Sequence, residues 1–507
     1  MLDNVEFIKT PAAPKPAPAS DACGLLTTDS PAIANAPLPA DGPGSKHFLN
    51  VAMASFLVII PYFVTRKLGL GFKTWVFFTL VLALPIMMAY WTLLSLFSPR
   101  LNEKVKLPGK PISHYLEFHT PELKAKYETS NGGQGTKIPM ETFHELYFAN
   151  KVSFKGDCLD VLEYRHDWAT FRFTLSLFRF FLFGMIPEVI MHSKSQDEEQ
   201  VRDHYDRGDD FYTWFLGPRM IYTSGCISDI NREESLEELQ DNKLNVVALK
   251  IQLHKDEHVL DLGCGWGTWA TFSSSQFGAK VTGVTLGRNQ TKWGTELLRK
   301  YGVGAEQSRI VCCDYRDTPK SEKASGKYDK ITCLEMAEHV GIRRFGAFLQ
   351  QVHDALEDDG IFFLQYAGLR KSWQYEDLIW GLFMNKYIFP GADALTPLAF
   401  VISALESAGF EIVTIDNIGV SYSATLWRWY RNWMGNKDKA VSKYGVKWFR
   451  IWEYFLALST ITSRQSGATC YQFVLRKNIN SYHRINYVPS QAGVITPAKE
   501  GIKWAKE

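Results

Sequence analysis

The chain has 507 residues, a formal net charge of +2 and 46% hydrophobic residues. Such a length accommodates more than one domain, and the near-neutral charge excludes the general attraction to nucleic acid that a strongly basic protein shows. The eight cysteines form no CxxC pair, which predicts neither a metal site nor a disulfide framework and favours a reducing compartment.

The N-terminal part divides into a polar tail and two apolar runs. Residues 1–46 hold eight of the 22 prolines, which predicts a disordered tail. The uncharged runs 48–65 and 74–99 approach or exceed the roughly 20 apolar residues that a helix needs to cross a bilayer. We therefore predict two transmembrane helices within 47–99, with a buried hairpin of a soluble domain as the alternative. Basic residues flank both ends of the pair, so charge does not set its orientation.

Residues 100–200 are predicted to be a membrane-proximal linker that contains one helix, 170–190. Arg172, Ser176 and Arg179 form a polar stripe on this Phe- and Leu-rich segment. Such a stripe is typical of a helix in the membrane interface, and an amphipathic helix packed on a catalytic domain has the same pattern.

From residue 201 to 476 the pattern is that of an α/β domain. Short apolar strands alternate with helical segments, of which 235–253 precedes the first strand, and this alternation predicts a mostly parallel sheet with helices on both faces. A last strand, 471–475, is expected to pair antiparallel at the sheet edge, before a polar tail, 477–507. The other expected strands are 258–262, 281–286, 310–313, 330–334, 361–366 and 412–415.

A glycine-rich turn follows the first of these strands. Asp261 precedes Gly263, Gly265 and Gly267 in a GxGxG spacing. Glycines let the backbone approach a ligand closely, and the turn lies at the carboxyl end of a strand, where open α/β sheets bind ligands. This form resembles class I S-adenosylmethionine (SAM) methyltransferases. Further candidate contacts to the co-substrate follow later strands: Thr285, Leu286, Gln290, Asp314 and Tyr315.

Several motifs together resemble one family, the cyclopropane-fatty-acyl-phospholipid synthases and mycolic acid methyltransferases. With the two apolar runs and the Pro-rich tail, the combination is similar to the fungal sphingolipid C9-methyltransferases. The motifs are His204–Tyr212, Met220–Ser224, the glycine turn, Gly283–Leu286, Glu335–Gly341, Ile388–Gly391 and Tyr422.

The resemblance implies an enzyme that methylates a lipid alkene. SAM is the co-substrate, with Tyr222 and Thr223 among its contacts, and the acceptor is carbon nine of the sphingoid base of glucosylceramide in a membrane. The alternatives are a synthase or methyltransferase acting on phospholipid acyl chains and a membrane scaffold that binds SAM without turnover. A soluble co-substrate places the catalytic domain in the cytosol, at the endoplasmic reticulum or another endomembrane.

The resemblance also bears on the catalytic base. Glu338 and Tyr422 match residues that help to hold a bicarbonate ion, which removes a proton from a carbocation. Ser224 and Gln365 stand where the synthases have Cys and His, and a neutral amide predicts weaker bicarbonate binding or none. We hypothesise that this rebuilt base site yields a methyl-branched alkene rather than a cyclopropane. His339, beside Glu338, is expected to be structural.

Overall fold

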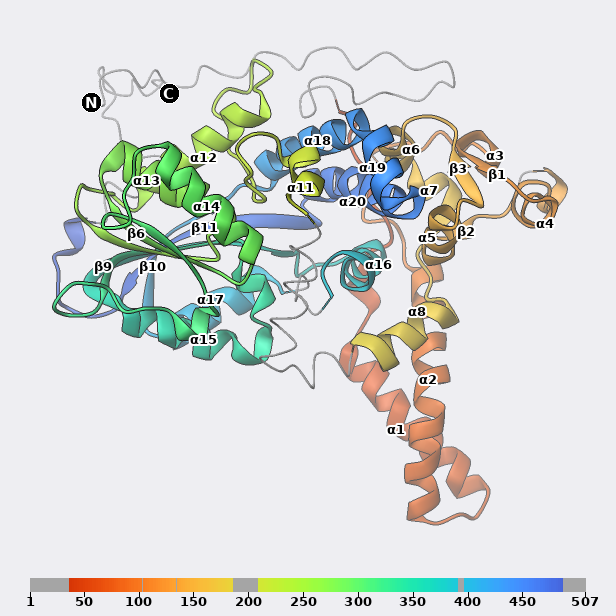
Figure 1. Ribbon diagram of the computed structural model, residues 1–507. Coiled ribbons are helices and arrows are strands. Elements are labelled where there is room, and N and C mark those ends of the chain that lie inside the picture. Colours follow the sequence, from red (N-terminus) through yellow and green to blue (C-terminus); the bar gives the residue numbers. More distant parts are fainter. Residues whose placement is uncertain (1–35, 103, 134, 186–207, 391–395, 487–507) are drawn as a thin grey trace, which may run out of the picture.

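The computed structural model describes residues 36–102, 104–133, 135–185, 208–390 and 396–486 (Figure 1). Residues 204–207 and 391 of the family motifs, residues 186–190 of the expected interfacial helix, and most of both predicted tails lie outside the described residues.

A seven-stranded sheet organises the C-terminal half, in the order β10-β11-β9-β8-β5-β6-β7 (Figure 1). The neighbours among β5 to β9 pair in parallel, so the predicted parallel sheet is confirmed, and each predicted strand is present within a few residues of its expected bounds. The strands are β5 (His258–Leu262), β6 (Lys280–Thr285), β7 (Arg309–Cys312), β8 (Tyr328–Leu334), β9 (Leu356–Leu369), β10 (Phe410–Asn417) and β11 (Ala468–Lys477).

The last strand, β11, pairs antiparallel as predicted, but it does not lie at the edge. It sits between β9 and β10 and pairs with both. Most of its residues are buried, which suits a strand with two neighbours and covered faces, whereas β10 is largely half-exposed and forms the edge.

Helices cover both faces of the sheet (Figure 1). One face carries α12 (Leu236–Lys250), α13 (Thr268–Phe277) and α14 (Arg288–Lys300), and the other carries α15 (Ile342–Ala355) and α17 (Leu398–Ser407). Ser235 fixes the start of α12 through a capping box with Glu238.

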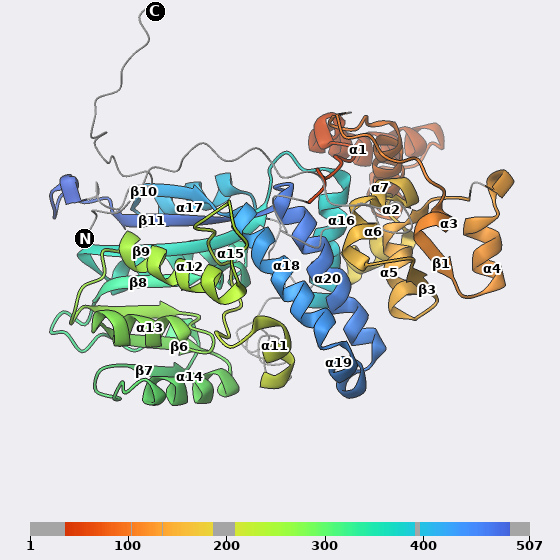
Figure 2. The ribbon, with the colours of Figure 1, turned by 90° about the horizontal axis from the view of Figure 1, so that it is seen from above.

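A helical layer separates the sheet from the N-terminal elements (Figure 2). It contains α18 and α20, and its remaining helices flank them. Its members are α11 (Asp209–Leu216), α16 (Tyr375–Phe383), α18 (Gly419–Gly435), α19 (Lys437–Tyr444) and α20 (Val446–Arg464).

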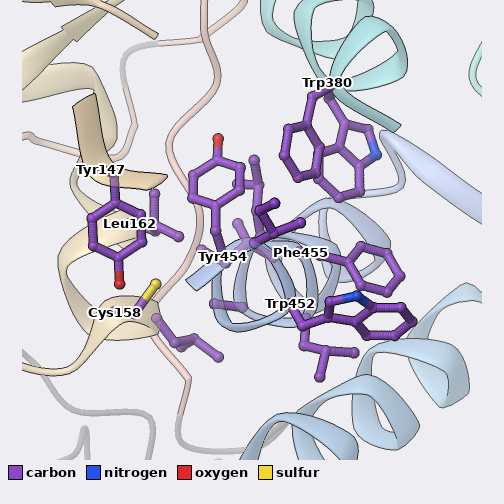
Figure 3. Close-up of a cluster of buried hydrophobic side chains, with 14 of the residues drawn as sticks. Tyr147, Cys158, Leu162, Trp380, Trp452, Tyr454 and Phe455 are labelled. Atoms are coloured by element: carbon purple, nitrogen blue, oxygen red, sulfur yellow. The ribbon is translucent and has the colours of Figure 1, made fainter. Parts of the chain in front are cut away.

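The segment expected to be a linker is instead a folded unit on this layer. Tyr454 of α20 lies on the side of the helix that faces Tyr147 and Leu162 of the segment, whereas Trp452 and Phe455 lie on the opposite side, toward Trp380 (Figure 3). Burial of these aromatic rings ties the segment to the core. Its elements are α3 (Ile112–Tyr115), β1 (Leu116–Phe118), α4 (Pro121–Leu123), β2 (Ile138–Pro139), α5 (Met140–Phe148), β3 (Val152–Phe154), α6 (Cys158–Glu163), α7 (Arg165–Trp168) and β4 (Ala169–Thr170).

The two apolar runs form an antiparallel helical pair, α1 (Asn50–Lys67) and α2 (Phe72–Phe97), that projects from the rest of the molecule (Figure 1). Among the described helices only α2 is long and apolar enough to cross a membrane. Because α1 begins at a polar residue and ends in Arg66 and Lys67, its apolar stretch is shorter, and the second predicted span is unsupported. About half of the exposed large apolar side chains described lie on this pair.

The expected interfacial helix begins later than predicted. The Thr174 hydroxyl accepts a hydrogen bond from the Leu177 N–H and caps α8 (Leu175–Phe180), and the π-helix η4 (Phe181–Met185) follows. Arg172 precedes the helix, so the stripe with Ser176 and Arg179 does not lie on one helix.

The N-terminal tail also ends earlier than residue 46. Ala40 is buried, and the Gly42 N–H donates to the Gln374 side chain at 2.7 Å. These contacts satisfy backbone groups that a disordered tail leaves to water. At the other end, Arg484 pairs with Glu411 at 3.0 Å, so the described part of the predicted C-terminal tail is also tied to the sheet.

A buried ion pair connects the N-terminal unit to α16 and offers a test of their coupling. Arg165, 1% exposed, donates to both carboxylate oxygens of Glu376, at 2.8 and 3.1 Å. Arg165→Met leaves a buried carboxylate without its main partner and is expected to cost about 3–5 kcal/mol, measured by denaturant unfolding in detergent. Arg484→Met, at an exposed pair, is the control. Equal losses in the two variants would contradict the coupling.

Candidate active site

The glycine turn between β5 and α13 is left-handed at all three glycines, with φ of 75° at Gly263, 53° at Gly265 and 77° at Gly267. A Cβ on Gly265 would meet no atom of the described residues within 4 Å, so this backbone faces open space among them. A Cβ on Gly267 would lie 2.9 Å from the Cα of Gly294 in α14. Gly267 therefore serves helix packing, and it does not line the cavity that Gly263 and Gly265 line, contrary to its predicted role.

This cavity, the glycine-turn cavity, lies at the carboxyl ends of β5, β6, β7 and β8, where parallel sheets bind ligands. It brings together all the other residues predicted to contact the co-substrate. They are Tyr222, Thr223, Asp261, Gly263, Gly265, Thr285, Leu286, Gln290, Asp314 and Tyr315.

The polar side chains that line the glycine-turn cavity form hydrogen bonds with other residues of the chain. The Thr285 hydroxyl donates to the Gln290 side chain at 2.6 Å. Burial raises the pKa of Asp261 to about 7, and the carboxyl accepts from the Thr332 hydroxyl at 2.8 Å. Arg316 donates to both oxygens of Asp314 at 2.6 Å, so an adenine amino group would share this carboxylate with Arg316.

A second cavity, the aromatic cavity, lies beside the first. Its walls come from β9, α16, η7 (Met384–Ile388), α18 and α20, and they are mostly apolar. Tyr222, Glu335 and His339 line both cavities, so they form the wall between them. The predicted catalytic residues Glu338 and Tyr422 line the aromatic cavity.

Glu338 belongs to η6 (Ala337–His339), directly after the turn that ends β8. One carboxyl oxygen accepts from the Ala367 N–H at 2.5 Å, and the other, buried, has no hydrogen-bond partner among the described residues. Burial, and then the charge of Glu335, raise the pKa of Glu338 to about 8. The group is therefore mainly protonated at neutral pH.

Glu335, the residue after β8, received no role in the sequence analysis. Its Oε1 accepts from the Ser224 N–H at 2.8 Å and from the Gln365 side chain at 2.5 Å. Burial raises the pKa of Glu335, and hydrogen bonds from Ser224, Gln365 and Tyr422 oppose that rise. A carboxylate at the carboxyl end of a central parallel strand was the signal that sequence reasoning had available.

The predicted catalytic residues Ser224 and Gln365 donate hydrogen bonds to Glu335 and line neither cavity. Both are fully buried, and the Ser224 hydroxyl donates to the Gly225 carbonyl at 2.8 Å. The side-chain carbonyl of Gln365 accepts a hydrogen bond from the Gln472 side chain at 2.9 Å. Because the Ser224 N–H and the Gln365 amide already bind a carboxylate, these residues do not fit a bicarbonate site.

Two further residues of the site were not predicted to act there. Lys243, 1% exposed, donates to the Thr223 hydroxyl at 2.9 Å, and its burial lowers its pKa while the charges of Glu335 and Asp261 act in the opposite sense. His339, which was expected to be structural, lines both cavities. Burial lowers its pKa to about 4, so it is neutral in the wall between the cavities.

Comparison with known proteins gives consistent results. The model of the mycolic acid cyclopropane synthetase family matches residues 192–473. Sphingolipid C9-methyltransferase of Candida albicans is 75% identical over 100% of this chain and 99% of its own length. The enzyme of that name from Komagataella phaffii is 68% identical over 95% of this chain and 98% of its own.

Among solved structures, the cyclopropane synthase MmaA2 from Mycobacterium tuberculosis has a TM-score of 0.51 and 24% identity, covering 55% of this chain and 98% of its own. Mycolic acid cyclopropane synthase CmaA1, solved with S-adenosylhomocysteine (SAH) and CTAB, has the same TM-score, identity and coverage. These likenesses show the fold of a class I methyltransferase.

Two of the left-handed glycines, Gly265 and Gly267, give a matched pair of variants. Gly265→Ala and Gly267→Ala both place a Cβ on left-handed backbone, a strain of about 1–2 kcal/mol. Only Gly267→Ala also places its Cβ too close to α14, and this overpacking is expected to lower the free energy of unfolding by about a further 1–3 kcal/mol. We expect Gly265→Ala to lose SAH affinity with a small loss of stability and Gly267→Ala to lose more stability, measured by calorimetric binding and thermal unfolding. The reverse order of stability would contradict this assignment.

The raised pKa of Glu338 predicts a pH-dependent stability. The folded protein holds this proton more tightly than the unfolded chain, so the contribution of Glu338 is fully present below about pH 4 and is lost as the pH rises through about 8. Glu338→Gln stays neutral, and its unfolding temperature should fall less than that of the wild type between about pH 5 and pH 8.5. The exposed Glu296→Gln is the control. The same decline in Glu338→Gln and wild type would contradict the shift.

Proposed function

Because the chain belongs to the sphingolipid C9-methyltransferases, within the mycolic acid cyclopropane synthetase family, we propose that it methylates carbon nine of the sphingoid base of glucosylceramide. It is a SAM-dependent methyltransferase. The observation that carries the proposed acceptor is the pair of adjoining cavities, one polar and glycine-lined, the other apolar and aromatic, with a shared wall of Tyr222, Glu335 and His339.

The glycine-turn cavity suits SAM. Gly263 and Gly265 leave backbone room for the methionine part, Thr285 and Gln290 offer polar atoms to the ribose, and Tyr315 offers a ring face to the adenine. The open space beside Gly265 supports this fit. SAM supplies an electrophilic methyl group on a sulfonium.

The aromatic cavity suits a hydrocarbon chain with a double bond. Trp380, Met384, Leu426 and Phe455 contribute apolar surface that excludes water, and water would otherwise capture a carbocation. Aromatic faces also stabilise a nearby cation. The wall residues hold the double bond beside the methyl group, and this alignment is the main work of the protein in such a reaction.

In the proposed reaction the π electrons of the alkene form a bond from carbon nine to the methyl carbon. The sulfur keeps the electron pair of the bond that breaks, and the neighbouring carbon becomes a cation. Loss of the proton from carbon nine then restores the double bond and leaves a methyl branch. Loss of a proton from the new methyl group would close a cyclopropane instead.

The helical pair supports a lipid supply from a membrane. Trp91 of α2 stacks on Trp373 at a centroid distance of 5.8 Å and contacts Tyr375, the first residue of α16. Further along the same helix, Trp380 lines the aromatic cavity. We propose that α1 and α2 anchor the protein in the endoplasmic reticulum or another endomembrane, with the catalytic domain in the cytosol and the bilayer as the source of lipid.

Product analysis tests the proposal. The full-length protein in lipid nanodiscs, given SAM and glucosylceramide with a double bond at carbon eight, should yield a sphingoid base with a vinylic methyl group, identified by mass spectrometry and NMR. A methyl group on oxygen, nitrogen or sulfur, or a cyclopropane, would contradict it.

A variant of the aromatic cavity serves as a control on the acceptor site. Leu426→Trp fills this cavity and should abolish lipid methylation while SAH still binds. The exposed Asp354→Asn should change neither. Full lipid methylation by Leu426→Trp would contradict the assignment of the aromatic cavity as the acceptor site.

A further inference from the structure

Glu335 has a backbone conformation that few residues other than glycine adopt. Glu335 directly follows the central strand β8 and has a φ of +56°. Its backbone N–H donates to the backbone carbonyl of Gln365 at 2.8 Å. Non-glycine residues in the left-handed region are uncommon and gather at functional sites. This conformation brings the carboxylate into the wall that both cavities share.

Hydrogen-bond donors from separate parts of the chain meet at this carboxylate. The Ser224 N–H precedes α12, Gln365 lies on β9, and the Cys470 thiol, 3.6 Å from Oε1, lies on β11. Tyr422 of α18 adds a further hydrogen bond. Such a set of convergent donors is a binding site for an anion, and the chain fills it with its own side chain.

The neighbouring carboxyl complements it. Among the described residues, Glu338 accepts from the Ala367 N–H and is mainly protonated, whereas Glu335 has several donors and the cation of Lys243 nearby. The charge of Glu335 acts on Glu338, and two carboxyl groups that interact in this way do not both ionise readily. The negative charge of the pair therefore resides on Glu335.

We propose that the Glu335 carboxylate is the proton acceptor of the reaction and replaces the bicarbonate of the related synthases. The inference rests on the proposed function. The C–H bond of the methylated carbon breaks, its electron pair forms the new double bond with the cationic carbon, and the proton goes to a Glu335 oxygen. The same negative charge stabilises the cation before the proton leaves.

Two substitutions at Glu335 test this role. Glu335→Gln keeps the size and hydrogen bonding but is not basic, and it should lower lipid methylation by about 10²–10⁴-fold with SAH affinity retained. Glu335→Gly suits the left-handed backbone and empties the anion site, so it should be inactive and regain activity with added bicarbonate or formate. The control is Asp256→Gly, which removes another left-handed carboxylate, at φ +63° and away from both cavities, and should not change activity.

The outcomes separate this inference from the proposed function. Full activity of Glu335→Gln, a wild-type enzyme that needs added bicarbonate, or a folded, SAH-binding Glu335→Gly that neither anion restores would each overturn the role of Glu335. Wild-type enzyme that methylates no glucosylceramide would instead overturn the proposed function. Activity of the wild type in bicarbonate-free buffer, with rescue of Glu335→Gly by either anion, supports the inference.

Discussion

The carboxylate of Glu335 is the interaction on which the two cavities depend. Donors from the loop before α12, from β9, from β11 and from α18 converge on it, so the position of one side chain requires the sheet and the helical layer to be assembled together. A carboxylate withdrawn from water is costly without such partners. The same network that offsets that cost holds a negative charge between a polar cavity and an apolar one.

The N-terminal elements matter to the site through α16 and α20. The helix α20 packs against the N-terminal unit on one side and against Trp380 of α16 on the other (Figure 3). The ion pair of Arg165 with Glu376 and the stacking of Trp91 on Trp373 reach the same helix α16. A helix that lines the acceptor cavity is thus fixed by the unit that carries the exposed apolar pair α1 and α2.

The sequence predicted the parts of this structure that local pattern determines. The strands of the sheet are apolar runs bounded by turn residues, and the glycine turn has its own spacing, so both were found close to their true bounds. The family motifs led to Glu338 and Tyr422, which line one cavity. The inner position of β11 was missed because pairing partners are a tertiary property, and the N-terminal unit was taken for a linker because its short elements have no long periodicity.

The site was predicted less well than the fold because its key contacts join distant segments. Ser224 and Gln365 were expected to hold an external anion, but they bind Glu335, which lies 111 and 30 residues away in sequence. Gly267 and Gly265 belong to the same sequence motif. Only the close approach of Gly294 in α14 shows that Gly267 serves helix packing and not ligand contact.

The central claim is that the methylated carbon itself loses the proton, in a site that carries its own base. The most direct test uses SAM with a fully deuterated methyl group and glucosylceramide deuterated at carbon nine. We predict a product that retains all the methyl deuterium and has lost the deuterium of carbon nine. A product that keeps deuterium at carbon nine and loses it from the methyl group would contradict the account.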